Sequence, residues 1–166
     1  MSWEVGSIEE AMRRIAARCR PEEFELYGRI HADAIKRYIR PTDRVLDFGC
    51  GIGRILKHMP PNVEGYDPTP SMRRFAKIYC GRDVLATLKG REHYYDVVYE
   101  CWVIQHLQPS VIGEILRVLK PGGIFITISS VDMPQHPVAL EPLDARIVPK
   151  MEIMRVFRNR PLRYDV

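Results

Sequence analysis

Hydrophobic positions in the first 39 residues recur at the spacing of amphipathic helices. Between residues 7 and 20, the apolar positions share one helical face: Ile8, Ala11, Met12, Ile15 and Cys19. Ser7 followed by Glu10 is a capping-box pattern, which predicts a helix start. Pro21 separates this segment from residues 22–39, where apolar residues again recur at helical spacing. The pattern therefore predicts two N-terminal helices.

From residue 44 onward, short apolar runs alternate with helical patterns. The runs predict strands at 44–48, 63–67, 83–85, 95–99 and 124–129. The segments 52–59, 70–79 and 109–119 carry helical spacing, and Pro-Pro or Pro-Gly-Gly follows the first and the last of them. Strands that alternate with helices predict an α/β fold with a mostly parallel, doubly wound sheet flanked by helices. Between residues 131 and 150, four prolines predict a loop-rich stretch, and 152–157 is one further candidate strand.

Composition narrows the class of protein. A length of 166 residues suggests one domain, and an apolar share of 46% with no run near the roughly 20 residues of a membrane helix favours a soluble, cytoplasmic chain. The four cysteines lack zinc-site spacing and are expected to be free thiols, so we expect no metal site. The net charge of +4 permits a nucleic-acid partner, but the dispersed arginines favour solvated faces.

The most informative motif is the turn from Asp47 to Gly53, which follows the strand at 44–48. Its spacing is Gly-x-Gly-x-Gly, whereas a nicotinamide dinucleotide fingerprint would place its third glycine where Arg54 stands. Asp47 adds a negative charge that disfavours a pyrophosphate. A ligand with an ammonium, a carboxylate and a sulfonium suits the turn better, which points to S-adenosylmethionine.

A second acidic residue supports this interpretation. Asp67 ends the strand at 63–67, 18 residues after Gly49. A carboxylate at that place can accept hydrogen bonds from both ribose hydroxyls of a nucleoside. The alternative is that Asp67 only caps the following helix.

Taken together, these motifs resemble the class I S-adenosylmethionine-dependent methyltransferases, over roughly residues 24–130. The resemblance is carried by five segments in the family's order: 45–54, 65–72, 95–99, 103–107 and 117–123. It implies a Rossmann-like fold whose last strands form an antiparallel pair. Because few residues follow residue 130, we expect this antiparallel portion to be short or incomplete. An exposed sheet edge would then favour a homodimer or a protein partner.

The resemblance also implies a single methyltransferase domain over residues 1–166. Residues 1–40 would be an N-terminal helical lid, residues 43–130 the cofactor-binding core, and residues 131–166 a loop-rich C-terminal segment. Tyr27 and His31 lie one helical turn apart and could face the pocket from the lid, although packing in the core is the simpler role for Tyr27.

The family's site residues carry over to matching positions. The implied cofactor-binding residues are Asp47, Gly49, Cys50, Gly51, Gly53, Asp67, Pro68, Met72, Asp83, Val84, Cys101 and Trp102. Asp47 and the loop would hold the methionine end, Asp67 the ribose, and Asp83-Val84 the adenine, with Met72 nearby. Cys101 and Trp102 would lie beside the methionine moiety and the transferred methyl. Glu100 and His106 are candidate catalytic residues, each with a structural alternative: a salt bridge for Glu100 and packing for His106.

The sequence therefore predicts a methyltransferase that acts on the oxygen or nitrogen of a small molecule. No Asn/Asp-Pro-Pro-Tyr/Phe motif follows the strand at 95–99, and Cys101 lacks a preceding proline, which disfavours DNA bases as acceptors. Two alternatives stay open. The chain could be a non-catalytic cofactor-binding module that acts through a protein partner, or a nicotinamide oxidoreductase.

Overall fold

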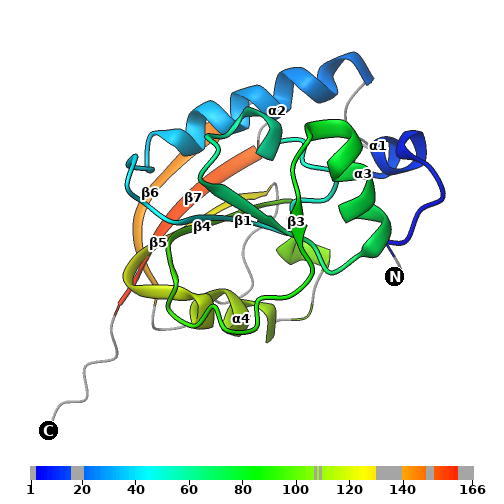
Figure 1. The fold of residues 1–166 in the computed structure, drawn as a ribbon. Helices are drawn as coiled ribbons and strands as arrows, with labels where there is room; N and C mark the ends of the chain where they lie inside the picture. Colours follow the sequence, from blue (N-terminus) through cyan, green and yellow to red (C-terminus); the bar gives the residue numbers. More distant parts are fainter. Residues whose placement is uncertain are drawn as a thin grey trace, which may run out of the picture. The chain divides into compact units, whose positions relative to one another are not determined.

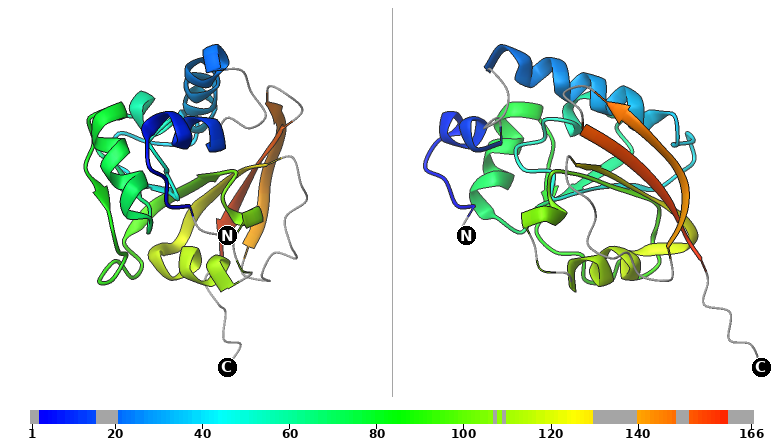
Figure 2. Two further views of the ribbon diagram at one scale, coloured as in Figure 1. Left: turned by 90° about the vertical axis from the view of Figure 1, so that its right-hand side faces the viewer. Right: turned by 180° about the vertical axis from the view of Figure 1, so that it is seen from behind.

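The structure is a computed structural model that describes residues 3–15, 21–106, 108, 110–129, 140–148 and 152–160. Its helices, 3-10 turns and strands are shown in Figures 1 and 2. The helical elements are α1 (Ile8–Ile15), α2 (Pro21–Lys36), η1 (Leu56–His58), α3 (Pro70–Cys80), η2 (Ile104–His106) and α4 (Ser110–Val118). The strands are β1 (Val45–Phe48), β2 (Val63–Tyr66), β3 (Val84–Leu85), β4 (Tyr95–Cys101), β5 (Leu119–Ser129), β6 (Leu140–Val148) and β7 (Glu152–Asn159).

The seven strands form one mixed sheet in the order β3-β2-β1-β4-β5-β7-β6. β2 pairs with β3, and β4 with β5, in parallel. β7 runs antiparallel to both β5 and β6. The predicted α/β class with a mostly parallel sheet and antiparallel C-terminal strands is confirmed. Contrary to the expectation, the antiparallel portion is not short, because β7 pairs with β5 over residues 124–129 and with β6 over residues 140–148.

The chain divides into two compact units. The first unit comprises Met1–Arg37 and Leu46–Leu88, and the second comprises Tyr38–Val45 and Lys89–Val166. Each unit combines two separate stretches of the chain, whereas the predicted lid, core and C-terminal segment are three consecutive stretches. That predicted division stays a prediction.

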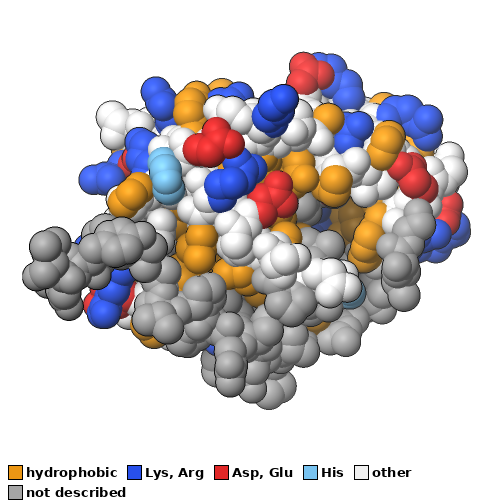
Figure 3. Space-filling model, turned by 90° about the horizontal axis from the view of Figure 1, so that it is seen from below, with side chains coloured by type: hydrophobic (Ala, Val, Ile, Leu, Met, Phe, Trp, Pro, Cys, Tyr) orange, Lys and Arg blue, Asp and Glu red, His pale blue; other side chains and the backbone are white. Residues whose placement is uncertain are grey.

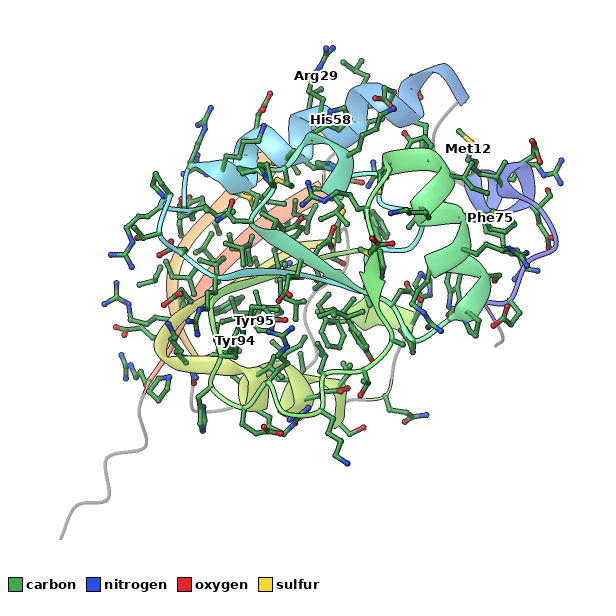
Figure 4. All side chains as sticks on the ribbon, in the orientation of Figure 1. Met12, Arg29, His58, Phe75, Tyr94 and Tyr95 are labelled. Carbon is green, nitrogen blue, oxygen red and sulfur yellow. The ribbon has the colours of Figure 1, made fainter. Side chains whose placement is uncertain are left out.

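In the first unit, the N-terminal helix packs against α3. The buried side chains of this cluster are Val5, Ala11, Phe24, Ile52, Met72 and Phe75. Figure 4 shows Met12 of α1 near Phe75 of α3, and Met12 packs against the same cluster. Ser7 Oγ accepts the amide of Glu10 at 3.1 Å, which confirms the predicted cap at the start of α1.

One predicted helix is wrong. The segment 52–59 forms only the short 3-10 turn η1, over Leu56–His58. Gly53 has a φ of +84°, so no α-helix can run through it, and Pro60 removes the donor that a continuing helix needs. The interval between these two residues is too short to hold a stable α-helix.

The end of α4 differs from the expectation in detail. The helix ends at Val118, and Pro121, Gly122 and Gly123 lie inside β5 rather than after the helix as its stop. The pairing of β4 and β5 shifts register between Tyr95 and Val97, which accommodates this irregular stretch.

The C-terminal region contains a strand where a loop-rich stretch was expected. β6 covers Leu140–Val148 despite Pro142, because β6 is the last strand of the sheet and an edge strand tolerates a residue that cannot donate. Its register shifts between Pro142 and Asp144. The predicted strand at 152–157 is confirmed as β7, which extends to Asn159. Residues 130–139, 149–151 and 161–166, the other parts of the predicted loop-rich segment, lie outside the described residues.

The surface mixes charges. On the face shown in Figure 3, lysine and arginine side chains lie among acidic ones. In the part of the chain that the structure describes, no helix is long and apolar enough to cross a membrane.

Candidate cofactor-binding site

The glycine loop follows β1, whose four residues are all buried. Gly49, Gly51 and Gly53 have φ angles of +71°, +57° and +84°, a region that residues with a side chain rarely adopt. A Cβ at Gly51 would lie 3.2 Å from Ile15 Cδ1, and one at Gly53 would overlap Cys80 Sγ. The Gly-x-Gly-x-Gly pattern thus reflects both the backbone conformation and close packing.

The loop is tied to the end of β2. The amides of Gly49 and Cys50 both donate to Tyr66 O, at 2.8 and 2.9 Å, and the amide of Gly53 donates to Cys50 O at 2.9 Å. These bonds place the loop beside the residue that follows Tyr66, which is Asp67.

Asp67 links the loop to the start of α3. Its Oδ2 accepts the amide of Gly51 at 3.0 Å, and its Oδ1 accepts the amide of Thr69 at 2.8 Å. The side chain is 7% exposed, and burial raises the pKa of its carboxyl group. Each oxygen of an ionised carboxylate can accept more than one hydrogen bond, so capacity for ribose hydroxyls is left beside the two amides.

A second buried carboxylate lies near the same loop. Asp47 is 3% exposed. The pKa of the Cys50 thiol is raised well above its usual value, first by burial and then by the charges of Asp47 and Asp67. Both aspartates therefore act electrostatically on the loop, and their negative potential suits a ligand with an ammonium and a sulfonium.

Other predicted cofactor residues of the first unit have varied surroundings. Met72 is 2% exposed and belongs to the core cluster, whereas Pro68 is exposed. Asp83 pairs with Lys77 Nζ at 2.9 Å on the surface, and Val84 pairs with Gly65 in the sheet. The predicted cofactor-binding roles of these four residues stay predictions.

The two candidate lid residues lie on α2. The rings of Tyr27 and His31 stack with their centroids 6.4 Å apart. His31 is buried, and its Nδ1 lies 3.3 Å from Arg54 Nη2, just beyond the glycine loop. α2 thus contacts the segment that follows the loop, while the role of the pair as a lid stays a prediction.

In the second unit, Glu100 is fully buried. Its Oε2 accepts the amides of Val103 and Ile104 at 2.8 and 3.2 Å, and its Oε1 accepts the hydroxyl of Thr127. Burial raises the pKa of this carboxyl group to about 7. The described contacts of Glu100 are thus hydrogen bonds that hold the turn after β4. They differ from the salt bridge that we expected as its structural role.

The other candidates of the second unit lie around that turn. Cys101 is the last residue of β4, and Trp102 follows it with a φ of +61°. His106 ends η2 and is exposed. The catalytic roles of Glu100 and His106 stay predictions.

Sequence reasoning missed two residues here. Thr127 donates its hydroxyl to Glu100, and Glu152 accepts the indole N–H of Trp102. A threonine within the otherwise apolar strand at 124–129 could have indicated a buried polar contact for Thr127. No pattern in the sequence indicates that Glu152 contacts Trp102. Across the described residues, no three His, Cys, Asp or Glu side chains gather in a way that could hold a metal ion.

Comparisons with known proteins agree with this geometry. Residues 46–127 match the family model described as a methyltransferase domain. The chain is 30% identical over 132 residues to N-terminal Xaa-Pro-Lys N-methyltransferase 1 of Rattus norvegicus, covering 69% of this chain and 58% of the relative. It is 33% identical over 112 residues to sterol 24-C-methyltransferase of Kluyveromyces lactis, covering 57% of this chain and 30% of the relative.

Among solved structures, phosphoethanolamine N-methyltransferase 1 of Haemonchus contortus, in complex with phosphoethanolamine and S-adenosylhomocysteine, has a similar fold. The TM-score is 0.62 at 16% identity, over 93% of this chain and 47% of that one.

The fold, the glycine loop and these matches define a class I methyltransferase domain. The chain belongs to the S-adenosylmethionine-dependent methyltransferase family. It spans between about a third and three fifths of the length of the two curated relatives described above.

Proposed function

We propose that this protein is an S-adenosylmethionine-dependent methyltransferase. The observation that carries the proposal is the hydrogen bond between the buried carboxylate of Asp67 and the amide of Gly51, which joins the two cofactor motifs. Dinucleotide-binding folds also carry an acidic residue for the ribose, so the preference for S-adenosylmethionine comes from the Gly-x-Gly-x-Gly spacing and from Asp47, whose charge disfavours a pyrophosphate.

The residues present fit the cofactor. Asp47 and the loop from Gly49 to Gly53 would hold the methionine end, and Asp67 would accept the ribose hydroxyls. Met72 and the Asp83-Val84 pair would lie near the adenine, and Pro68 is a further proposed cofactor-binding residue. Cys101 and Trp102 would border the methionine and the transferred methyl. The bound cofactor supplies an electrophilic methyl group on a sulfonium, whose carbon–sulfur bond breaks with its electron pair on sulfur as the acceptor attacks.

The acceptor is proposed to be the oxygen or nitrogen of a small molecule. Because the leaving group is already activated, the protein mainly needs to align the acceptor and exclude water. A general base is needed only when the acceptor must lose a proton, and Glu100 and His106 are our candidates for that role. The named relatives suggest the order of testing, since two of the three described above are N-methyltransferases.

The location and partners belong to the same proposal. We propose a cytoplasmic protein that binds a second copy or a protein partner through an exposed sheet edge, and β6, one of the two edge strands, is our candidate. A nucleic-acid acceptor is the less favoured alternative.

The test is an acceptor screen with S-adenosylmethionine labelled in its methyl group. The screen contains phosphoethanolamine, small amines and alcohols, a sterol, and a hexapeptide that begins Ser-Pro-Lys. Label on an oxygen or nitrogen of phosphoethanolamine, an amine or an alcohol supports the full proposal. Label only on the peptide, or only on a carbon of the sterol, rejects the proposed oxygen or nitrogen acceptor in a small molecule. If the protein binds the cofactor but transfers its methyl group to none of these compounds, the non-catalytic cofactor-binding module is favoured.

A further inference from the structure

Trp102 has an unusual backbone conformation for its residue type. Its φ of +61° lies in the left-handed region, which is costly for a residue with a bulky side chain. Such a conformation persists only where the surroundings enforce it, and such residues cluster at active sites and ligand-binding segments.

Several contacts of the second unit enforce this conformation. The amide of Trp102 donates to Ile128 O at 2.9 Å, continuing the β4–β5 ladder by one residue. The next two amides, of Val103 and Ile104, donate to Glu100. These bonds fix the backbone of the turn but leave the direction of the indole ring undetermined.

Glu152 supplies that missing constraint. The indole Nε1 donates to Glu152 Oε1 at 2.6 Å, a short bond to a charged acceptor. The sheet explains how residues 50 positions apart meet. Cys101 pairs with Ile128 in β5, and Ser129 of β5 pairs with Ile153 of β7, so Trp102 and Glu152 flank the carboxyl end of β5.

We propose that Glu152 is a positioning residue: it holds the indole of Trp102 at the carboxyl edge of the sheet, so that Trp102 can border the bound cofactor. This inference rests on the proposed function, in which Trp102 lies beside the methionine and the transferred methyl. In this proposal, β7 acts on the site through the side chain of Trp102, which follows β4.

The experiment uses Glu152→Ala and Glu152→Gln in a Trp3→Phe background, where Trp102 is the one remaining tryptophan of the sequence. Glutamine keeps an oxygen that can accept the indole N–H, whereas alanine does not. Glu141→Ala is the matched control, because Glu141 lies on the neighbouring strand and pairs with Arg160 at 2.8 Å. The readouts are Trp102 emission, its quenching by acrylamide, and calorimetric affinity for S-adenosylhomocysteine.

We expect Glu152→Ala to shift Trp102 emission, to increase quenching and to weaken S-adenosylhomocysteine binding about tenfold, the effect of losing one charge-assisted hydrogen bond. Glu152→Gln should stay within about threefold of the parent and Glu141→Ala should be unchanged, since each keeps an acceptor for the indole.

Two results would overturn the inference: unchanged Trp102 emission in Glu152→Ala, or altered emission with unchanged affinity. A parent protein that fails to bind S-adenosylhomocysteine would instead refute the proposed function, and the emission of the ligand-free variants would still report whether Glu152 holds the indole.

Discussion

In the first unit, the carboxylate of Asp67 binds an amide 16 residues away, whereas in the second unit the indole of Trp102 binds a carboxylate 50 residues away. The first arrangement comes from two consecutive strand ends and the loop between them. The second depends on a strand that returns antiparallel from the end of the chain. The cofactor motifs are thus set by local sequence, while the turn after β4 is set by the sheet as a whole.

The largest expected difference between the units is in the free energy of unfolding, when a helical glycine is replaced by alanine in each. Gly28→Ala in α2 would place a Cβ 2.5 Å from Arg54 O, whereas at Gly113 in α4 nothing lies within 4 Å. We expect Gly28→Ala to lower the free energy of unfolding by about 3 kcal/mol, because a backbone atom must move. Gly113→Ala should raise it by about 1 kcal/mol through helix propensity. Urea denaturation measures both, and equal effects would mean that α2 does not pack closely on Arg54.

The next effect concerns the buried carboxyl of the second unit. The pKa of Glu100 is about 7 in the native state, above its ordinary 4.5, so the folded protein binds this proton more tightly than the unfolded chain. Its stabilising contribution is full below about pH 4.5 and is lost as the pH rises through 7. Relative to Glu100→Gln, the wild type should lose on the order of 2–3 kcal/mol between pH 4.5 and 8.

Denaturation at several pH values measures this difference, and Glu114→Gln on α4 serves as the surface control. Parallel pH profiles for wild type and Glu100→Gln would show that the carboxyl ionises as readily in the native protein as in the unfolded chain.

The third effect returns to the first unit and concerns ligand affinity. Asp67→Ala removes the acceptor of Gly51 and Thr69, together with the proposed partner of the ribose. We expect S-adenosylhomocysteine binding to weaken by about 2 kcal/mol, the range for a charged hydrogen bond. Asp33→Ala on α2 of the same unit should leave the affinity unchanged, because Asp33 pairs with Lys36 on the surface and is not among the proposed site residues. Affinity unchanged in Asp67→Ala would mean that the ribose site is misplaced.

The smallest effect tests the N-terminal helix. Ser7 caps α1, so Ser7→Ala should lower the free energy of unfolding by about 1 kcal/mol. Hydrogen exchange should show the loss in α1, with α4 of the second unit unaffected. Exchange that rises equally in both helices would argue against a local cap.

The difference between local motifs and contacts set by the whole sheet also explains which features the sequence predicted correctly. The cap at Ser7, the strand before Gly49 and the turn at Asp67 are local features, and each is visible as a short motif. The helix expected at 52–59 failed because apolar spacing does not report the positive φ of Gly53. β6 was missed because Pro142 is acceptable on an edge strand, and the position of a strand in the sheet is a property of the fold. The same holds for Glu152, whose partner lies 50 residues away.

The central claim is that the first unit binds S-adenosylmethionine through the glycine loop and Asp67. Calorimetric titration with S-adenosylhomocysteine and, separately, with NAD tests it most directly, because the glycine loop is shared between the two cofactor classes. We predict saturable binding of one S-adenosylhomocysteine per chain and none of NAD. Binding of NAD without S-adenosylhomocysteine, or of neither ligand, would contradict the claim.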